Sequence, residues 1–151
     1  MMTVRAVLAG REYALGPLTE SLGFLTRAVN VQINERVRAS GGLGVSPAIF
    51  STLQLLQVNP GIRQVDAARL LVIQESNMAN LVKDLVARGL VERRGETPKR
   101  VGLWITAAGE SELARCAIDL AADRIYGGVL SDAEYGQLLQ LLNRVYRAAL
   151  A

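Results

Sequence analysis

The chain has 151 residues, half of them hydrophobic, with 17 basic and 14 acidic side chains and a formal net charge of +3. This length predicts one domain, or one domain with helical extensions. No apolar run reaches the roughly 18 residues that would span a bilayer. The first ten residues lack the apolar core and cleavage site of a signal peptide, so we expect a cytoplasmic protein.

The sequence contains one cysteine, Cys116, and no histidine. One cysteine excludes an intrachain disulfide, and a zinc site built from cysteine and histidine is excluded as well. The absence of histidine also removes the commonest general base. We therefore expect no enzyme, no metal and no cofactor. Because Cys116 follows the apolar Leu113 in a predicted helix, we interpret it as a buried, inert thiol.

Helical periodicity dominates the first third of the chain. Apolar residues recur every three or four positions from Pro17 to Ala39, which predicts a long helix that ends at the glycines of residues 41–44. A second helix begins with Ser46 as N-cap and Pro47 in its first turn, and Asn59-Pro60-Gly61 ends it. These apolar stripes offer more surface than one small protomer can bury, so we expect an obligate oligomer.

A helix-turn-helix pattern follows. A short helix over 64–71, a turn over 72–75 and a helix that ends near Arg88 are predicted, and in the latter helix Met78, Leu81, Val82, Leu85 and Val86 share one side. Small and amide side chains and one lysine occupy the other side and suit a DNA groove; they are Ser76, Asn77, Asn80 and Lys83. The same stripe also fits the solvent-facing side of an ordinary surface helix.

A basic hairpin is predicted next, with strands over 90–94 and 99–105 and a turn over 95–98. Its tip concentrates positive charge at Arg93, Arg94, Lys99 and Arg100. Between residues 76 and 100 there are six basic and three acidic side chains. Such a hairpin can reach phosphates or a minor groove, although charges of this kind also occur on hairpins for solubility alone.

Two further helices complete the pattern. Thr106 is expected to cap a helix over 107–126, which Gly127-Gly128 ends. Ser131 and Glu134 form a capping-box sequence before a last helix over 132–150.

The order of these elements and several short motifs resemble the MarR-type family of winged helix-turn-helix transcription regulators, over about residues 15–149. The motifs are Ser46-Pro47-Ala48-Ile49-Phe50, Gly61-Ile62-Arg63-Gln64 with Ala67-Ala68, Leu81-Val82-Lys83-Asp84-Leu85 with Gly89-Leu90-Val91, and Ile105-Thr106-Ala107-Ala108-Gly109. One stretch departs from the pattern: Thr97-Pro98-Lys99 stands where the family usually carries Asp-x-Arg in the wing, and Arg100 follows one position later.

The resemblance implies a fold that is mainly α with a small antiparallel β wing, a winged helix-turn-helix with N- and C-terminal dimerisation helices. The whole of residues 1–151 would be one MarR-like chain. About 11–40 and 107–151 would form the dimerisation region, and about 46–106 the DNA-binding lobe. A homodimer would bind a pseudo-palindromic operator in double-stranded DNA, with its two reading helices in successive major grooves.

The resemblance also implies a repressor that a small molecule releases, with a phenolic or aromatic carboxylate as effector and no membrane partner. An apolar cleft with one or two polar anchors would suit such a ligand; the candidates are Arg11, Tyr13, Phe24, Arg27 and Phe50. The phenylalanines also fit plain core packing, and the arginines fit solvated or interface salt bridges. The competing function is a winged-helix module that binds proteins without binding DNA.

Overall fold

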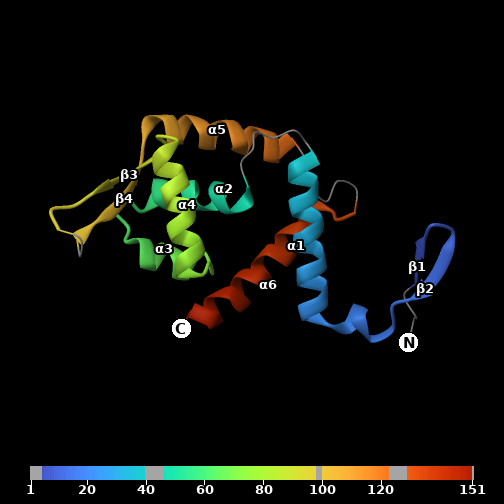
Figure 1. Cartoon of the computed structure of the whole chain (residues 1–151). Helices are drawn as coiled ribbons and strands as arrows, with labels where there is room; N and C mark the ends of the chain where they lie inside the picture. Colours follow the sequence, from blue (N-terminus) through green and yellow to red (C-terminus); the bar gives the residue numbers. More distant parts are fainter. Residues whose placement is uncertain (1–4, 40–45, 98–99, 123–128, 151) are drawn as a thin grey trace. The chain divides into compact units, whose positions relative to one another are not determined.

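The computed structural model describes residues 5–39, 46–97, 100–122 and 129–150, and the chain divides into two compact units, Met1–Gly41 and Gly42–Ala151 (Figure 1). The first unit opens with an antiparallel hairpin of β1 (Arg5–Leu8) and β2 (Arg11–Ala14). Ala9 and Gly10 join the strands with positive φ angles of 49° and 76°, as a two-residue hairpin turn requires. Sequence analysis did not predict this hairpin.

The first long helix begins later than its periodicity predicted. A 3-10 helix, η1 (Gly16–Glu20), comes first, and α1 (Leu22–Ala39) starts only after Ser21. Ser21 has an extended backbone, with ψ at 111°, and its hydroxyl accepts a hydrogen bond from the Phe24 N–H at 3.3 Å. This side-chain cap satisfies an otherwise free donor of the first turn, so the α-helix begins there rather than at Pro17.

The second unit contains α2 (Pro47–Val58), α3 (Gln64–Leu70), α4 (Glu75–Ala87), β3 (Val91–Arg94), β4 (Gly102–Ile105), α5 (Ala107–Ala122) and α6 (Asp132–Leu150). The Ser46 hydroxyl accepts a hydrogen bond from the Ile49 N–H at 3.3 Å, which confirms the predicted start of α2. β3 and β4 form the predicted antiparallel hairpin beside the helices (Figure 1). The fold class predicted from the sequence is therefore confirmed.

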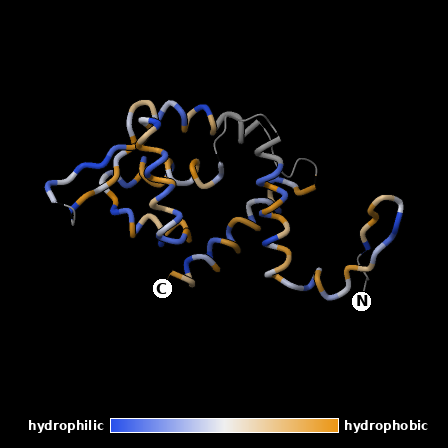
Figure 2. Tube along the Cα trace, viewed as in Figure 1, coloured by the Kyte–Doolittle hydropathy of each residue, from blue (hydrophilic) through white to orange (hydrophobic). Residues whose placement is uncertain are grey.

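The core of the second unit is built mainly from side chains of α2, α4, β4 and α5. Its largest fully buried side chains include Leu53 and Leu56 of α2, Met78 and Leu85 of α4, and Leu103 of β4. In Figure 2 the first strand of the wing, β3, is largely blue, that is, hydrophilic. Cys116 of α5 is also buried in this core, as expected.

Both helices of the helix-turn-helix end in the same C-terminal motif. After α3, the N–H of Ile73 donates to the carbonyl of Ala68 at 2.9 Å, and the N–H of Val72 donates to that of Arg69. The same pair of hydrogen bonds follows α4: the Leu90 N–H donates to the Leu85 carbonyl, and the Gly89 N–H donates to the Val86 carbonyl. Such a Schellman motif needs a left-handed residue after the cap. Gly89 fills this position with φ at 71°, but Val72 fills the other with φ at 54°.

The capping box of α6 forms as predicted. The Ser131 N–H donates to Glu134 Oε2 at 2.8 Å, and the Glu134 N–H donates to Ser131 Oγ at 3.3 Å. These bonds from the backbone and side chain of Ser131 hold the pKa of Glu134 below its ordinary value. The predicted stops at 41–44 and at Gly127-Gly128 lie outside the described residues. None of the helices described here is both long and apolar enough to cross a membrane.

Candidate nucleic-acid interface

The buried side of α4 fixes which of its residues face outward. Met78, Val82 and Leu85 are fully buried against the core. Leu81 is half-buried, but Val86, which periodicity placed on the same apolar side, is 38% exposed. Val86 follows the fully buried Leu85 in the last turn of α4, so it lies at the margin of the buried side. The apolar side is therefore narrower than the sequence predicted.

The predicted reading residues share the outer side of α4. Ser76, Asn77, Asn80 and Lys83 are all exposed, and their side chains make no hydrogen bond or ion pair to the described part of the chain. Two amides, a hydroxyl and an ammonium group are thus free to meet an external partner. Amide side chains can pair with adenine edges in a major groove, and a lysine can pair with guanine or a phosphate.

Backbone bonds attach the wing to the helix-turn-helix. The Gly61 N–H donates to the Leu103 carbonyl at 2.9 Å, and the Leu103 N–H donates to the Ile62 carbonyl at 2.9 Å. At the other end of β4, the Thr106 hydroxyl donates to the Gly89 carbonyl at 2.7 Å and accepts from the Gly109 N–H at 3.1 Å. Thr106 therefore caps α5, as predicted, and also connects it to the end of α4.

The four basic residues predicted for the wing do not lie alike. Arg93 Nη2 donates to Gln64 Oε1 at 2.9 Å, which directs Arg93 toward the start of α3. Arg94 forms an ion pair with Glu92 and lies over the Trp104 ring. Arg100 is exposed, and its backbone N–H donates to the Thr97 carbonyl at 2.9 Å. Because this bond keeps Arg100 out of the strand, the strand predicted from Lys99 begins only at Gly102; Lys99 itself lies outside the described residues.

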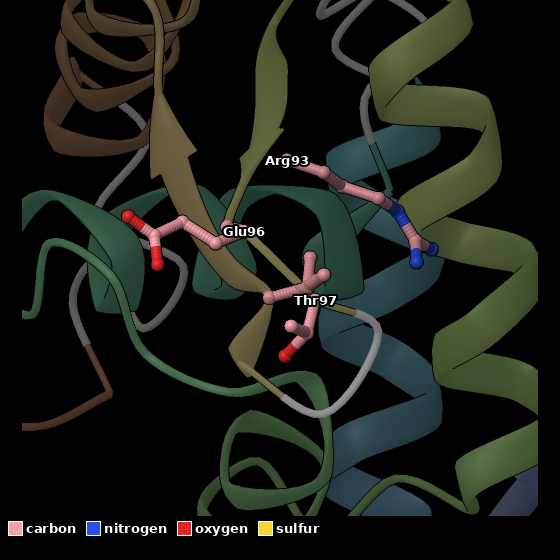
Figure 3. A pocket seen from close by; sticks show the side chains of 5 residues that line it. Arg93, Glu96 and Thr97 are labelled. Atoms are coloured by element: carbon pink, nitrogen blue, oxygen red, sulfur yellow. The ribbon is translucent and has the colours of Figure 1, made fainter.

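A hollow of about 420 Å³ lies near the tip of the wing, lined by Arg93, Gly95, Glu96, Thr97 and Val101 (Figure 3). In Figure 3 the Arg93 side chain points away from Glu96. The lining contains no aromatic ring and one aliphatic side chain, which does not suit an aromatic ligand. We assign this hollow no ligand.

Several charged side chains near α3, α4 and the wing are neutralised by ion pairs. Arg63 at the start of α3 forms a two-bond pair with Asp66, at 2.7 and 3.0 Å. The guanidinium lowers the pKa of Asp66, and the carboxylate raises that of Arg63. Arg88 pairs with Asp84 at 3.5 Å. Lys83 and Arg100 have no ion pair with the described part of the chain, so both charges are available to an external partner.

The predicted effector residues are distributed over both units. Arg11 and Tyr13 lie two positions apart on β2, so they share one face of the N-terminal hairpin, and both are exposed. Phe24 and Arg27 lie one turn apart on α1. Phe50 of α2 is half-buried and packs against the core of the second unit, which fits the packing alternative. The hairpin that carries Arg11 and Tyr13 was missed; its turn residues, Ala9-Gly10, are a weak sequence signal.

An amphipathic helix with a free polar side, a preceding short helix and an attached basic hairpin define a winged helix-turn-helix protein. Comparison with known proteins agrees: the profile of the MarR family matches residues 43–100. A solved structure of the transcriptional repressor CouR bound to a 23-mer DNA duplex is 30% identical, covers 89% of this chain and 99% of its own, and has a TM-score of 0.77. The chain therefore belongs to the MarR family of transcription regulators.

Two further relatives are informative. CouR bound to p-coumaroyl-CoA is also 30% identical, over 88% of this chain and 96% of that one, with a TM-score of 0.74. A protein of Thauera aromatica, described as a candidate transcriptional regulator of the hcr operon, is 34% identical over 107 residues. That alignment covers 69% of this chain and 64% of the relative, so the chain spans just under two thirds of its length.

Proposed function

We propose that this chain binds a pseudo-palindromic operator in double-stranded DNA as a homodimer and represses transcription there. The observation that carries the proposal is the unpaired polar side of α4, with Ser76, Asn77, Asn80 and Lys83 beside a wing that carries Arg94, Lys99 and Arg100. In this arrangement α4 enters a major groove and the wing contacts the backbone or the adjacent minor groove. The DNA-bound structure of CouR, 30% identical to this chain, supports the proposal.

We infer a second role for one wing residue. Because Arg93 donates to Gln64, it braces the wing against α3, and the DNA contact predicted for it from the sequence stays a prediction. Arg93, Arg94, Lys99 and Arg100 remain the wing residues that we propose meet DNA. Residues of α4 would read bases, and wing residues would add affinity that falls with salt.

Exposed apolar side chains support the homodimer. In the last helix they include Leu138, Leu141, Leu142 and Val145, which repeat at helical spacing. A stripe of this kind on an isolated helix is costly in water, and burying it against a second copy removes that cost. Sedimentation analysis should therefore find a dimer, and Leu142→Glu should shift it toward monomer.

We further propose that a small aromatic effector releases the protein from DNA, as a free phenolic or aromatic carboxylate or as its coenzyme A thioester. CouR, bound to p-coumaroyl-CoA, supports the thioester form. Arg11, Tyr13, Phe24, Arg27 and Phe50 remain the candidate ligand residues. In this proposal the protein acts as a regulator rather than as an enzyme, and it binds its operator in the cytoplasm.

Thermal-shift and DNA-release assays test the ligand. We expect p-coumaroyl-CoA or p-coumaric acid to raise the melting temperature and to lower operator affinity; coenzyme A alone is the control. Arg27→Ala with unchanged ligand affinity would remove Arg27 from the candidate residues. If neither aromatic compound binds or affects the DNA complex, this effector class is wrong.

A further inference from the structure

One face of the wing carries four residues that the strand register brings together. Arg94 lies opposite Gly102, and Glu92 lies opposite Trp104. Because side chains alternate across a strand, residues two apart on each strand share this face. Arg94 and Trp104 are therefore diagonal neighbours, within reach of each other for long and aromatic side chains.

Two glycines make the space that the Trp104 ring occupies. A Cβ at Gly102 would lie 2.7 Å from Trp104 Cζ3, and a Cβ at Gly61 would lie 2.7 Å from Trp104 Cζ2. Any side chain at either position would therefore displace the ring. An aromatic residue that covers a neighbouring strand glycine compensates for the missing side chain. The indole is thus held between the α2–α3 connection and the wing.

The ring in turn holds Arg94. The Arg94 Cζ lies 5.4 Å from the Trp104 ring centroid, within the range of a cation–π contact. Glu92 pairs with the Nη2 group of the same guanidinium. The Arg94 side chain nevertheless remains 59% exposed, so other donors of the guanidinium face solvent. A guanidinium fixed on two sides loses less freedom when it contacts a phosphate.

We propose that Trp104 is a positioning residue for DNA binding, which holds Arg94 over its ring so that the free edge of the guanidinium meets an operator phosphate. The contact between Trp104 and Arg94 lies in a wing that carries Thr97 where the MarR-type pattern has aspartate. The proposal rests on the proposed function, because it presupposes a DNA complex. The contact between ring and guanidinium, however, exists without DNA and can be measured without it.

Fluorescence tests the contact in the free protein, because Trp104 is the only tryptophan of the chain. Arg94→Ala should change the emission maximum and increase quenching by acrylamide, a neutral quencher that reports the exposure of the ring, and Lys83→Ala is the matched control that should change neither. An unchanged spectrum and unchanged quenching in Arg94→Ala would overturn the proposal, whether or not the protein binds DNA.

A double-mutant cycle tests the positioning role on an operator duplex selected from a random pool. Arg94→Ala should make the slope of log affinity against log salt shallower by about 2 per dimer, one phosphate contact from each protomer. Trp104→Leu should weaken binding about 5- to 30-fold, as two exposed cation–π contacts would. In the Arg94→Ala background, the same change should have almost no further effect. Trp104→Phe retains a ring and should restore most of the affinity.

Lys83→Ala serves as the control partner in this cycle. The loss of DNA-binding free energy that it causes should add fully to the loss caused by Trp104→Leu. If the losses from Arg94→Ala and Trp104→Leu also add fully, Trp104 acts only through wing stability and the proposal is wrong. The same holds if the wild type binds and Arg94→Ala leaves both affinity and salt slope unchanged. Failure of the wild type to bind any selected duplex would instead refute the proposed function.

Discussion

Replacing Val72 with glycine should stabilise the protein, although it removes three carbon atoms from the chain. Val72 occupies the left-handed position after α3 with φ at 54°, where a β-branched residue is strained. Gly89 occupies the equivalent position after α4 with φ at 71° and the same pair of backbone bonds. The chain therefore contains a matched pair: Val72→Gly relieves the strain, and Gly89→Val introduces it.

The magnitude follows from three contributions. A left-handed backbone costs an L-residue about 1–2 kcal/mol. Glycine cancels about 0.5–1 kcal/mol of the gain from relieved strain, because it gives the unfolded chain more conformational freedom. The Val72 side chain is 78% exposed, so little burial is lost. We expect Val72→Gly to raise the free energy of unfolding by about 0.5–1 kcal/mol. Because a Cβ at Gly89 would meet no atom within 4 Å, Gly89→Val should lower it by a similar amount.

Urea denaturation at a fixed protein concentration measures both changes, since the stability of a dimer depends on concentration. For a chain of this length we expect shifts in melting temperature of roughly 1–4 °C, upward for Val72→Gly and downward for Gly89→Val. Val58→Gly, at an exposed helical position, is the control and should destabilise slightly. If Val72→Gly destabilises the protein, Val72 contributes packing or coupling that outweighs its strain.

Three further predictions test the packing of α4, the cap of α5 and the start of α6. Leu85→Ala should cost about 2–5 kcal/mol, whereas Val86→Ala, on the exposed margin, should cost under about 1 kcal/mol; equal losses would contradict the burial we describe. Thr106→Val should cost about 1–2 kcal/mol, because it removes both the α5 cap and the bond to Gly89; thermal denaturation with Thr106→Ser as a rescue measures this. Since the folded-state pKa of Glu134 is lowered, its contribution exists above the ordinary carboxyl pKa and is lost as pH falls through the folded value. The stability advantage of the wild type over Glu134→Ala should therefore shrink on acidification, and a difference independent of pH would refute it.

Periodicity and capping residues predicted most of the second unit. Ser46, Thr106 and the Ser131-Glu134 pair each mark a helix start that the structure confirms, because a side-chain cap is a local interaction. The hairpin of residues 5–14 was missed because its strands are four residues each and its turn carries a single glycine. The start of α1 was misplaced because Ser21 competes with Pro17 as a start signal.

The chemistry of the candidate interface was harder to predict than its location. Helical spacing put Ser76, Asn77, Asn80 and Lys83 on one side, and the structure leaves all four exposed. Composition alone could not separate Arg93, which bonds to Gln64, from Arg94, which lies on Trp104. Both contacts join residues that are distant in sequence or depend on strand register, so only the folded chain shows them.

The most direct test of DNA recognition is operator binding measured against salt. The 151-residue chain is incubated with a pool of random duplexes, and the affinity of the enriched sequence is measured by fluorescence anisotropy between 50 and 200 mM salt. We predict enrichment of a pseudo-palindrome, with affinity that falls roughly 10³- to 10⁵-fold over this range for about 6 to 10 phosphate contacts per dimer. Asn80→Ala should weaken binding and relax selectivity at one position of each half-site. No enriched sequence, or affinity independent of salt, would contradict the account and favour a winged helix that binds protein instead.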